Sequence, residues 1–162
     1  MKKSFQILPI GTIHTPYNQS VDVPIQSTLS DGVEGTIEIF TPYVDGLKDL
    51  DGFSHILLLF YFHRSEGYKL QVTPFLDDRL HGVFSTRAPR RPNMIGLSVV
   101  ELVSLKDNIL KIRNVDMIDG TPLIDIKPYV PVFDKIQDPG IGWLTGKINP
   151  NDRPKVDDRF VS

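Results

Sequence analysis

His55-Ile-Leu-Leu-Leu-Phe-Tyr-Phe62 contains the longest uninterrupted apolar run of the chain, seven residues from Ile56 to Phe62. Its branched and aromatic side chains favour a β-strand. Because such a strand is apolar on both faces, we expect it to occupy a central place in a sheet. Seven residues are far fewer than the roughly 20 that a helix needs to cross a bilayer, so the run predicts no membrane span.

Five further segments rich in branched and aromatic residues are separated by turn signals, which makes each a candidate strand. They cover residues 5–13, 33–40, 82–86, 97–103 and 109–115. Lys106-Asp107-Asn108, between the last two, predicts a β-hairpin, and residues 44–50 predict a short helical turn. We therefore predict a mainly β fold, an antiparallel barrel that is closed or nearly closed, because closure removes exposed strand edges.

The length of 162 residues fits one domain with a substantial core. After about Gln137 the apolar pattern weakens, and residues 149–159 are polar with two prolines. We therefore expect a barrel domain over residues 1–137 and an extended C-terminal extension over residues 138–162. The chain has no cysteine, which excludes a thiolate nucleophile and cysteine-ligated metals and is consistent with a cytoplasmic protein.

The net charge of −2, from 18 basic and 20 acidic residues, argues against a protein whose whole surface binds nucleic acid. Three arginines nevertheless fall within five residues in the segment Phe84-Ser-Thr-Arg-Ala-Pro-Arg-Arg-Pro-Asn-Met-Ile-Gly-Leu-Ser98. Its prolines would stiffen a loop between two strands, and guanidinium groups on a stiff loop are suited to bind a carboxylate or a phosphate. A solvated charged loop without a ligand is the alternative.

A second dense segment is Asn114-Val-Asp-Met-Ile-Asp-Gly-Thr-Pro-Leu-Ile-Asp-Ile-Lys-Pro-Tyr129. Asp119-Gly-Thr-Pro122 has the composition of a turn, and turn formation alone would explain it. The three aspartates, Asp116, Asp119 and Asp125, are more than a turn needs. Such carboxylates are able to accept hydrogen bonds from ribose hydroxyls or from an exocyclic amine.

The four histidines do not predict a metal site. His55 and His63 are eight residues apart on one candidate strand, so their backbones would lie about 26 Å apart, too far to share an ion.

The glycine-containing segment Gly140-Ile-Gly-Trp-Leu-Thr-Gly146 departs from the dinucleotide-binding fingerprint in spacing and context, and we interpret it as a loop. The chain also lacks a Gly-x-Ser-x-Gly nucleophile elbow.

Four ordered segments together resemble the TrmO/TsaA-like family of S-adenosylmethionine-binding proteins. They are Ile10-Gly-Thr-Ile-His-Thr-Pro-Tyr17, Leu50-Asp-Gly-Phe-Ser-His-Ile-Leu-Leu-Leu-Phe-Tyr-Phe-His63, Arg91-Pro-Asn-Met-Ile-Gly-Leu-Ser98 and Asp119-Gly-Thr-Pro-Leu-Ile-Asp-Ile-Lys-Pro-Tyr129. The resemblance implies a β-barrel methyltransferase, usually a homodimer with cofactor sites near the subunit interface. It also implies methylation of N6 of the threonylcarbamoyl-adenine beside the anticodon of tRNA.

Transfer of the family's cofactor contacts, motif by motif, implies eleven binding residues: Pro24, Ile25, Gln26, His63, Arg64, Arg87, Leu97, Met117, Ile118, Asp119 and Gly120. Within this set we expect Arg87 to pair with a carboxylate or phosphate, and Leu97 and Ile118 to supply apolar walls for adenine. Methyl transfer to a nitrogen needs an acceptor for its proton, and Asn93 and Asp116 are our candidates.

Arg90 and Arg91 are expected to contact RNA phosphates. Bacterial members of the family carry a second, C-terminal domain associated with tRNA, whereas only about 25 residues follow the predicted barrel here. Either tRNA binds through the arginine loop of the barrel or a different substrate applies. A non-catalytic module that binds S-adenosylmethionine or RNA therefore stays open as the alternative function, and a nucleotide hydrolase is a distant third.

Overall fold

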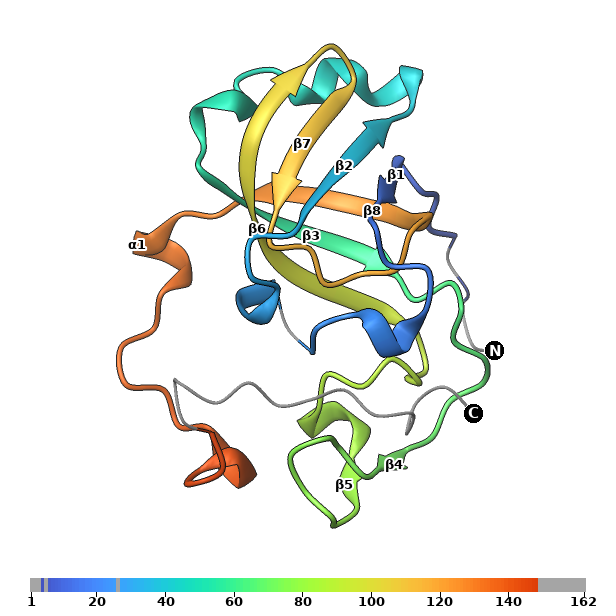
Figure 1. The fold of residues 1–162 in the computed structure, drawn as a ribbon, viewed down its shortest axis with the longest axis vertical. Helices are drawn as coiled ribbons and strands as arrows, with labels where there is room; N and C mark the ends of the chain where they lie inside the picture. Colours follow the sequence, from blue (N-terminus) through green and yellow to red (C-terminus); the bar gives the residue numbers. More distant parts are fainter. Residues whose placement is uncertain (1–3, 5, 26, 149–162) are drawn as a thin grey trace.

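The computed structural model describes residues 4, 6–25 and 27–148, and its main body is a closed barrel of six strands (Figure 1). The order around the barrel is β1-β2-β7-β6-β3-β8, and all neighbouring strands are antiparallel. The barrel strands are β1 Gly11–His14, β2 Glu34–Ile39, β3 His55–Tyr61, β6 Ile95–Lys106, β7 Ile109–Arg113 and β8 Thr121–Pro128. The predicted antiparallel β-barrel is thus confirmed.

The predicted central strand is β3, which pairs along its length with β6 on one side and β8 on the other. Ile56, Leu58 and Phe60 point into the barrel and are buried, whereas Leu57 and Leu59 point outward and are half-buried. The outer face of β3 is therefore apolar without being fully covered by this chain. The prediction of a central strand with apolar residues on both faces is thus confirmed.

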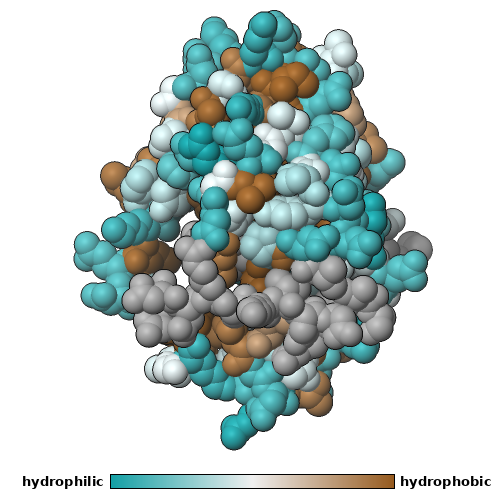
Figure 2. Space-filling model, viewed as in Figure 1, coloured by the Kyte–Doolittle hydropathy of each residue, from teal (hydrophilic) through white to brown (hydrophobic). Residues whose placement is uncertain are grey.

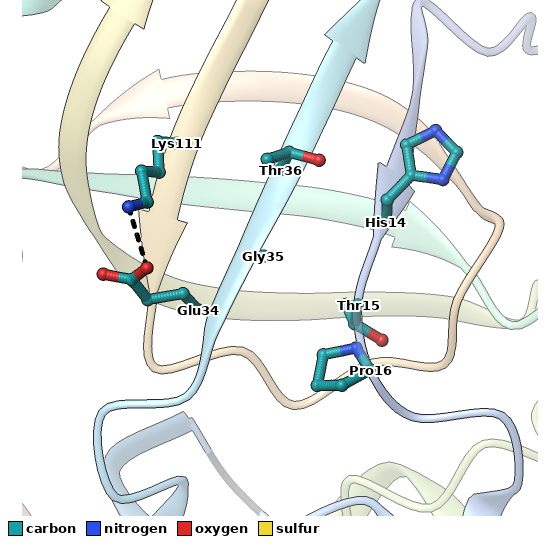
Figure 3. Close-up of a pocket in the computed structure, with 7 residues that line it drawn as sticks. All are labelled: His14, Thr15, Pro16, Glu34, Gly35, Thr36 and Lys111. Carbon is teal, nitrogen blue, oxygen red and sulfur yellow. Dashed lines mark ion pairs between the residues drawn. The ribbon is translucent and has the colours of Figure 1, made fainter.

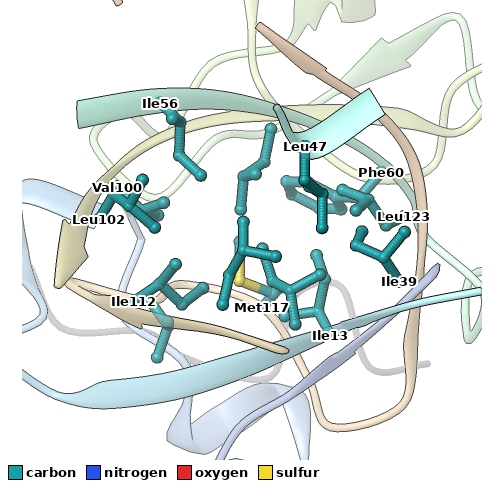
Figure 4. Packing of buried hydrophobic residues seen from close by; sticks show 14 residues of the cluster. Ile13, Ile39, Leu47, Ile56, Phe60, Val100, Leu102, Ile112, Met117 and Leu123 are labelled. Carbon is teal, nitrogen blue, oxygen red and sulfur yellow. The ribbon is translucent and has the colours of Figure 1, made fainter. Parts of the chain in front are cut away.

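The core fills the barrel with branched aliphatic side chains and one aromatic ring (Figure 4). It comprises Ile13, Ile37, Ile39, Leu47, Ile56, Leu58, Phe60, Val100, Leu102, Leu110, Ile112, Val115, Met117 and Leu123. Each barrel strand contributes, because inward side chains alternate with outward ones along a strand. Leu47, the last residue of the 3-10 helix Thr41–Leu47, comes from outside the strands and is buried in the same core.

Most of the other predicted elements exist with different boundaries. The hairpin at Asp107 and Asn108 is confirmed, since it joins β6 to β7 with Lys106 opposite Ile109. The helical turn predicted over 44–50 is a 3-10 helix, Thr41–Leu47, followed by another, Leu50–Gly52. Of the strand predicted over 5–13, only the end is regular as part of β1, and residue 5 lies outside the described residues.

One strand prediction was wrong, and one strand was missed. Residues 82–86 do not form a barrel strand: β5, His81–Gly82, pairs with β4, Gln71–Val72, in a separate small sheet, and Val83–Ser85 is a 3-10 helix. The barrel strand β8 was not predicted at all, because Pro122, Asp125 and Pro128 interrupt its apolar pattern. Both prolines sit close to its ends, where the ladder tolerates them.

Residues 64–91 form a lobe outside the barrel, which contains β4, β5 and the three arginines (Figure 1). The short helix α1, Pro131–Asp134, lies on a strap that leaves the barrel after β8 (Figure 1). The chain then returns to the lobe, where Trp143 stacks on His81 at 4.3 Å between ring centroids and donates a hydrogen bond to the Ser85 carbonyl at 2.8 Å. Lys147 completes this clasp by pairing with Asp77.

The remaining short 3-10 helices of the described part are Ser20–Asp22, Ser27–Leu29 and Gly142–Leu144. Within this part of the chain no helix is long and apolar enough to span a bilayer. The residues of the predicted polar tail, 149–159, lie outside it.

Candidate functional site

Three of the predicted site segments meet at one end of the barrel because of strand pairing. Tyr61, at the end of β3, is opposite Ile95 at the start of β6, and Ile13 of β1 is opposite Thr121 at the start of β8. The residues just beyond these strand ends are therefore neighbours. The Thr121 hydroxyl lies 3.5 Å from Nδ1 of His63 and donates to the Ile118 carbonyl at 2.6 Å, which places His63 beside the turn at residues 117–120.

This turn is fixed to β1 and the segment after it. The main-chain amides of Asp119 and Gly120 donate to the carbonyls of Tyr17 and Ile13 at 2.8 and 3.0 Å. The Asp119 carboxylate accepts a hydrogen bond from the Thr15 amide at 3.0 Å and lies 3.4 Å from Nδ1 of His14. One oxygen of Asp119 is thus engaged by the protein, and His14 is a neighbour that our sequence reasoning missed.

Met117 has its side chain and its main-chain carbonyl engaged within the protein. Its side chain is buried in the barrel core, so only its main chain is available to a ligand. Its carbonyl already accepts a hydrogen bond from the Thr15 hydroxyl at 2.8 Å. Ile118, Asp119 and Gly120 are half-buried and form the outer part of the turn.

Asp116 lies on the inner side of the same turn, and the Ser98 hydroxyl donates to its Oδ1 at 2.6 Å. Burial raises the pKa of Asp116 to about 6, against the opposing effects of the Ser98 hydroxyl, the Ser27 main chain and the positive charge of Arg87. Burial, with the negative charges of Asp116 and Asp31, also raises the pKa of Tyr17. Asp116 is therefore a carboxylate that changes charge close to neutral pH.

A serine without a partner borders this region. Among the buried side-chain polar atoms of the described residues, the Ser30 hydroxyl is the one that makes no hydrogen bond. It follows the 3-10 helix Ser27–Leu29, whose first residue contributes to the surroundings of Asp116. Buried polar groups normally have partners, so the Ser30 hydroxyl is an exception in this fold. Ser30 and Ser98 carry no distinctive local pattern in the sequence, and the fold alone reveals their roles.

His63 and Arg64 follow β3 directly. Burial, together with the positive charge of Arg64, lowers the pKa of His63, so its imidazole is neutral at physiological pH. Arg64 donates from Nη1 to the Asn18 carbonyl at 3.1 Å, which ties it to the segment after β1. The predicted pair is thus located at this end of the barrel, with Arg64 partly occupied by the main chain.

Leu97 and the loop residues are distributed over different surfaces. Leu97 points outward from β6 and is half-exposed, whereas the next residue, Ser98, points inward toward Asp116. Arg87 is exposed in the lobe, and its charge acts on Asp116. The Leu97 side chain therefore points away from the Ser98–Asp116 pair. A single copy of the chain does not bring Leu97 and Asp116 into one cavity.

The other predicted residues lie at the rim. Asn93 is exposed in the turn that leads into β6. Arg91 donates from Nη1 to the carbonyls of Thr86 and Ala88 at 3.2 and 3.3 Å, so its guanidinium braces the arginine loop from within. Arg90 is half-buried.

The first loop is described in part. Pro24 and Ile25 are half-buried between the 3-10 helices Ser20–Asp22 and Ser27–Leu29. Gln26, the third predicted contact of this loop, lies outside the described residues.

Two hollows are present in the surface. A shallow one of about 290 Å³ lies over β1, β2 and β7 and is lined by His14, Thr15, Pro16, Glu34, Gly35, Thr36 and Lys111 (Figure 3). Lys111 and Glu34 form an ion pair of 2.9 Å across its floor. A larger hollow of about 580 Å³ lies beside the 3-10 helices Thr41–Leu47 and Leu50–Gly52, at the end of the barrel away from the turn at residues 117–120. None of the predicted site residues lines this larger hollow. In the described part of the chain, no three histidine or acidic side chains are placed to hold a metal ion.

Comparisons with known proteins identify relatives of this chain. Residues 12–135 match the sequence model of the tRNA-methyltransferase O N-terminal domain. A probable S-adenosyl-L-methionine-binding protein of Pyrococcus abyssi is 51% identical over 154 residues, which cover 95% of this chain and 84% of that protein. The tRNA (adenine(37)-N6)-methyltransferase of Escherichia coli is 41% identical over 145 residues, covering 83% of this chain and 62% of the enzyme.

The same relationship is visible in three dimensions. The crystal structure of TrmO from Pseudomonas aeruginosa superposes with a TM-score of 0.74 at 36% identity, over 87% of this chain and 63% of that one. The chain thus spans most of the archaeal relative and less than two thirds of the bacterial ones.

Proposed function

Because the chain belongs to the family of the tRNA-methyltransferase O N-terminal domain, we propose that it transfers a methyl group from S-adenosylmethionine to N6 of an adenine in tRNA. The proposed substrate is the threonylcarbamoyl-adenine beside the anticodon, which places the reaction in the cytoplasm. The observation that carries the proposal is the position of Asp116. This carboxylate has a pKa of about 6, precedes the turn at residues 117–120 directly and is close enough to Arg87 to interact with its positive charge.

The residues at this end of the barrel fit S-adenosylmethionine chemically. The cofactor offers a carboxylate, an ammonium group, a ribose diol and an adenine. Arg87 supplies a cation for the carboxylate, and the outer oxygen of Asp119 is a candidate acceptor for ribose or ammonium hydrogens.

When bound, S-adenosylmethionine supplies a methyl group on a positively charged sulfur. In the proposed step a bond forms between N6 and the methyl carbon, and the bond between that carbon and sulfur breaks. Asp116 accepts the N6 proton, directly or through one water, and it is ionised for this role above pH of about 6. Ser98 holds the carboxylate in position through its 2.6 Å hydrogen bond. The Asn93 amide can accept a hydrogen bond but cannot hold a proton at neutral pH, so we assign it to orientation of the base.

We expect Arg87→Ala to weaken S-adenosylmethionine binding by at least about tenfold, because one charge-assisted pair to a carboxylate is worth roughly 1.5–3 kcal/mol. Isothermal titration calorimetry measures this directly. Lys48→Ala, at the opposite end of the barrel, is the matched control and should bind with the wild-type affinity. Equal affinities for all three proteins would remove Arg87 from the site.

A non-catalytic module that binds S-adenosylmethionine is the second candidate. It is favoured by the names of archaeal relatives, which record binding of S-adenosyl-L-methionine. Both candidates require cofactor binding. Transfer of a labelled methyl group to tRNA separates them.

We further propose that the protein is a homodimer. The strap after β8 carries three strongly exposed apolar side chains, Val132, Phe133 and Ile136, and Figure 2 shows apolar surface where α1 projects. The outer face of β3 and β6 is also apolar, with Leu57, Leu59 and Leu97. Exposed apolar surface of this extent supports contact with a second copy of the chain. In such a dimer, residues of the partner subunit would lie against Leu97.

Phe133→Asp is expected to convert the dimer into a monomer, because an ionised carboxylate would be buried in the proposed subunit contact. Phe133 is 81% exposed in the single chain, so the change should leave the fold intact. Light scattering coupled to size-exclusion chromatography reports the mass. Leu8→Asp, at another exposed apolar position, is the control, and a Phe133→Asp protein of unchanged dimeric mass would exclude the strap from the interface.

A further inference from the structure

The 64–91 lobe differs in charge from the rest of the molecule. It contains six basic residues, Arg64, Lys69, Arg79, Arg87, Arg90 and Arg91, and three acidic ones, Glu66, Asp77 and Asp78. Subtracting this lobe charge of +3 from the chain's −2 leaves −5 for all other residues. The negative charge of one of these acids, Asp77, is compensated within the clasp. Hydrogen bonds from Lys147 and, to a smaller extent, from His81 hold the pKa of Asp77 below its usual range. The lobe is thus a basic unit on an acidic protein.

Two aromatic rings on the lobe are exposed next to its arginines. Phe84 is 75% exposed in the 3-10 helix three residues before Arg87. Tyr68 is 60% exposed, and the following residue, Lys69, donates its main-chain amide to the Arg90 carbonyl at 3.3 Å. Each ring therefore lies beside the arginine loop.

These rings are not needed for the lobe's own packing. Val72, Val83 and Ala88 are buried and form a small interior for it. The large side chains left on the outside include Leu70 and Leu80 as well as the two aromatics. Exposed apolar surface of this kind on a small basic unit indicates a binding surface.

The surface is also held rigid. Arg91 braces the loop from within through its bonds to the Thr86 and Ala88 carbonyls. The clasp fixes the other side, where Trp143 stacks on His81 and bonds the Ser85 carbonyl next to Phe84. A preformed surface loses little conformational freedom when it binds.

We propose that this lobe binds the single-stranded loop of the tRNA anticodon arm, with Phe84 and Tyr68 stacking on unpaired bases and the basic side chains contacting phosphates. The inference rests on the proposed function and names the part of the chain that holds its substrate. Proteins recognise single-stranded RNA by stacking splayed bases on aromatic and arginine side chains along a basic surface. The lobe also carries Arg87, so an RNA bound there is delivered to the cofactor end of the barrel.

Binding of a fluorescent anticodon stem-loop RNA, followed by anisotropy without S-adenosylmethionine, tests the proposal. We expect Phe84→Ala and Tyr68→Ala each to weaken binding by about five- to 100-fold, as loss of one stacked base does. Phe84→Trp should retain binding, whereas Phe84→Leu, apolar but unable to stack, should not. Arg90→Ala should lower the slope of log affinity against log salt by about 0.7, the value for one contact to single-stranded nucleic acid. Tyr43→Ala, in the 3-10 helix Thr41–Leu47, is the control for an exposed aromatic ring outside the lobe and should bind RNA as the wild type does.

Unchanged RNA affinity in both Phe84→Ala and Tyr68→Ala would overturn the proposal. So would a change in oligomeric mass in these variants with RNA affinity retained, because the surface would then be a subunit contact. Calorimetry with S-adenosylmethionine and methyl-transfer assays on the same proteins keep the two hypotheses apart. A protein that binds the stem-loop through the lobe but transfers no methyl group would refute the proposed activity and leave the RNA surface standing.

Discussion

Asp116→Asn is expected to lower kcat for methyl transfer by about 100-fold or more, because it removes the group proposed to take the N6 proton. Asparagine has nearly the same shape and its Oδ1 is still able to accept the Ser98 hydrogen bond, so the position of the side chain is preserved. Affinity for S-adenosylmethionine should change by less than about threefold. Steady-state kinetics and calorimetry on the same preparation separate these two effects.

The pH dependence gives an independent signature of the same carboxylate. The wild-type rate should rise with pH through about 6, where Asp116 loses its proton, and the variant should lack this rise. Burial raises the pKa of Asp116 from 3.8 to about 6, so between these values the folded protein holds the proton more tightly than the unfolded chain. The carboxyl group's contribution to stability is thus full below pH of about 4 and is lost as pH rises through 6.

At pH 7 the ionised carboxylate is therefore a cost to folding, and Asp116→Asn should melt at the wild-type temperature or above it. A lower melting temperature with unchanged kcat would show that Asp116 has a structural role only. Asn93→Ala is the useful comparison, because an orienting residue should affect the rate without removing the rise near pH 6.

Gly11→Ala is expected to destabilise the barrel by about 3 kcal/mol, the upper part of the range for overpacking. Gly11 lies in β1 opposite Ile39 of β2, and a Cβ at this position would be 2.4 Å from the Glu38 carbonyl oxygen and 3.1 Å from Cδ1 of Ile39. The carbonyl belongs to a strand of a closed barrel and cannot move aside without disturbing the β1–β2 ladder. For a chain of this length the melting temperature should fall by roughly 6–12 °C.

Gly46→Ala is the matched control for this substitution. Gly46 lies in the 3-10 helix Thr41–Leu47, and a Cβ there would have no atom within 4 Å. Its melting temperature should stay within about 3 °C of the wild type. Similar melting temperatures for the two variants would mean that close packing of β1 against β2 contributes little to stability.

The barrel could be predicted from the sequence where apolar and turn residues alternate clearly. The apolar run of β3 and the Asp107-Asn108 hairpin both correspond to observed elements. β8 could not be predicted, because Pro122 and Asp125 conceal a strand whose place is set by pairing with β1 and β3. Long-range pairing of this kind has no local sequence signal.

The site was predictable to a similar degree. Asp116 stood out because three aspartates in one segment exceed the needs of a turn. Its raised pKa follows from burial, which outweighs the lowering effect of the Ser98 hydrogen bond, and both are products of the fold. The Met117 side chain fills the core, which the sequence alone did not show, since it does not reveal which face of the turn points inward.

Methyl transfer to tRNA tests the central claim most directly. The protein is incubated with S-adenosylmethionine bearing an isotopically labelled methyl group and with tRNA that carries threonylcarbamoyl-adenine, and the nucleosides are then separated and identified by mass spectrometry. We predict that the label appears on N6 of that nucleoside with the wild-type protein and falls by about 100-fold in initial rate with Asp116→Asn. Tight binding of S-adenosylmethionine without transfer of label to this nucleoside would contradict the account and leave the protein a binding module.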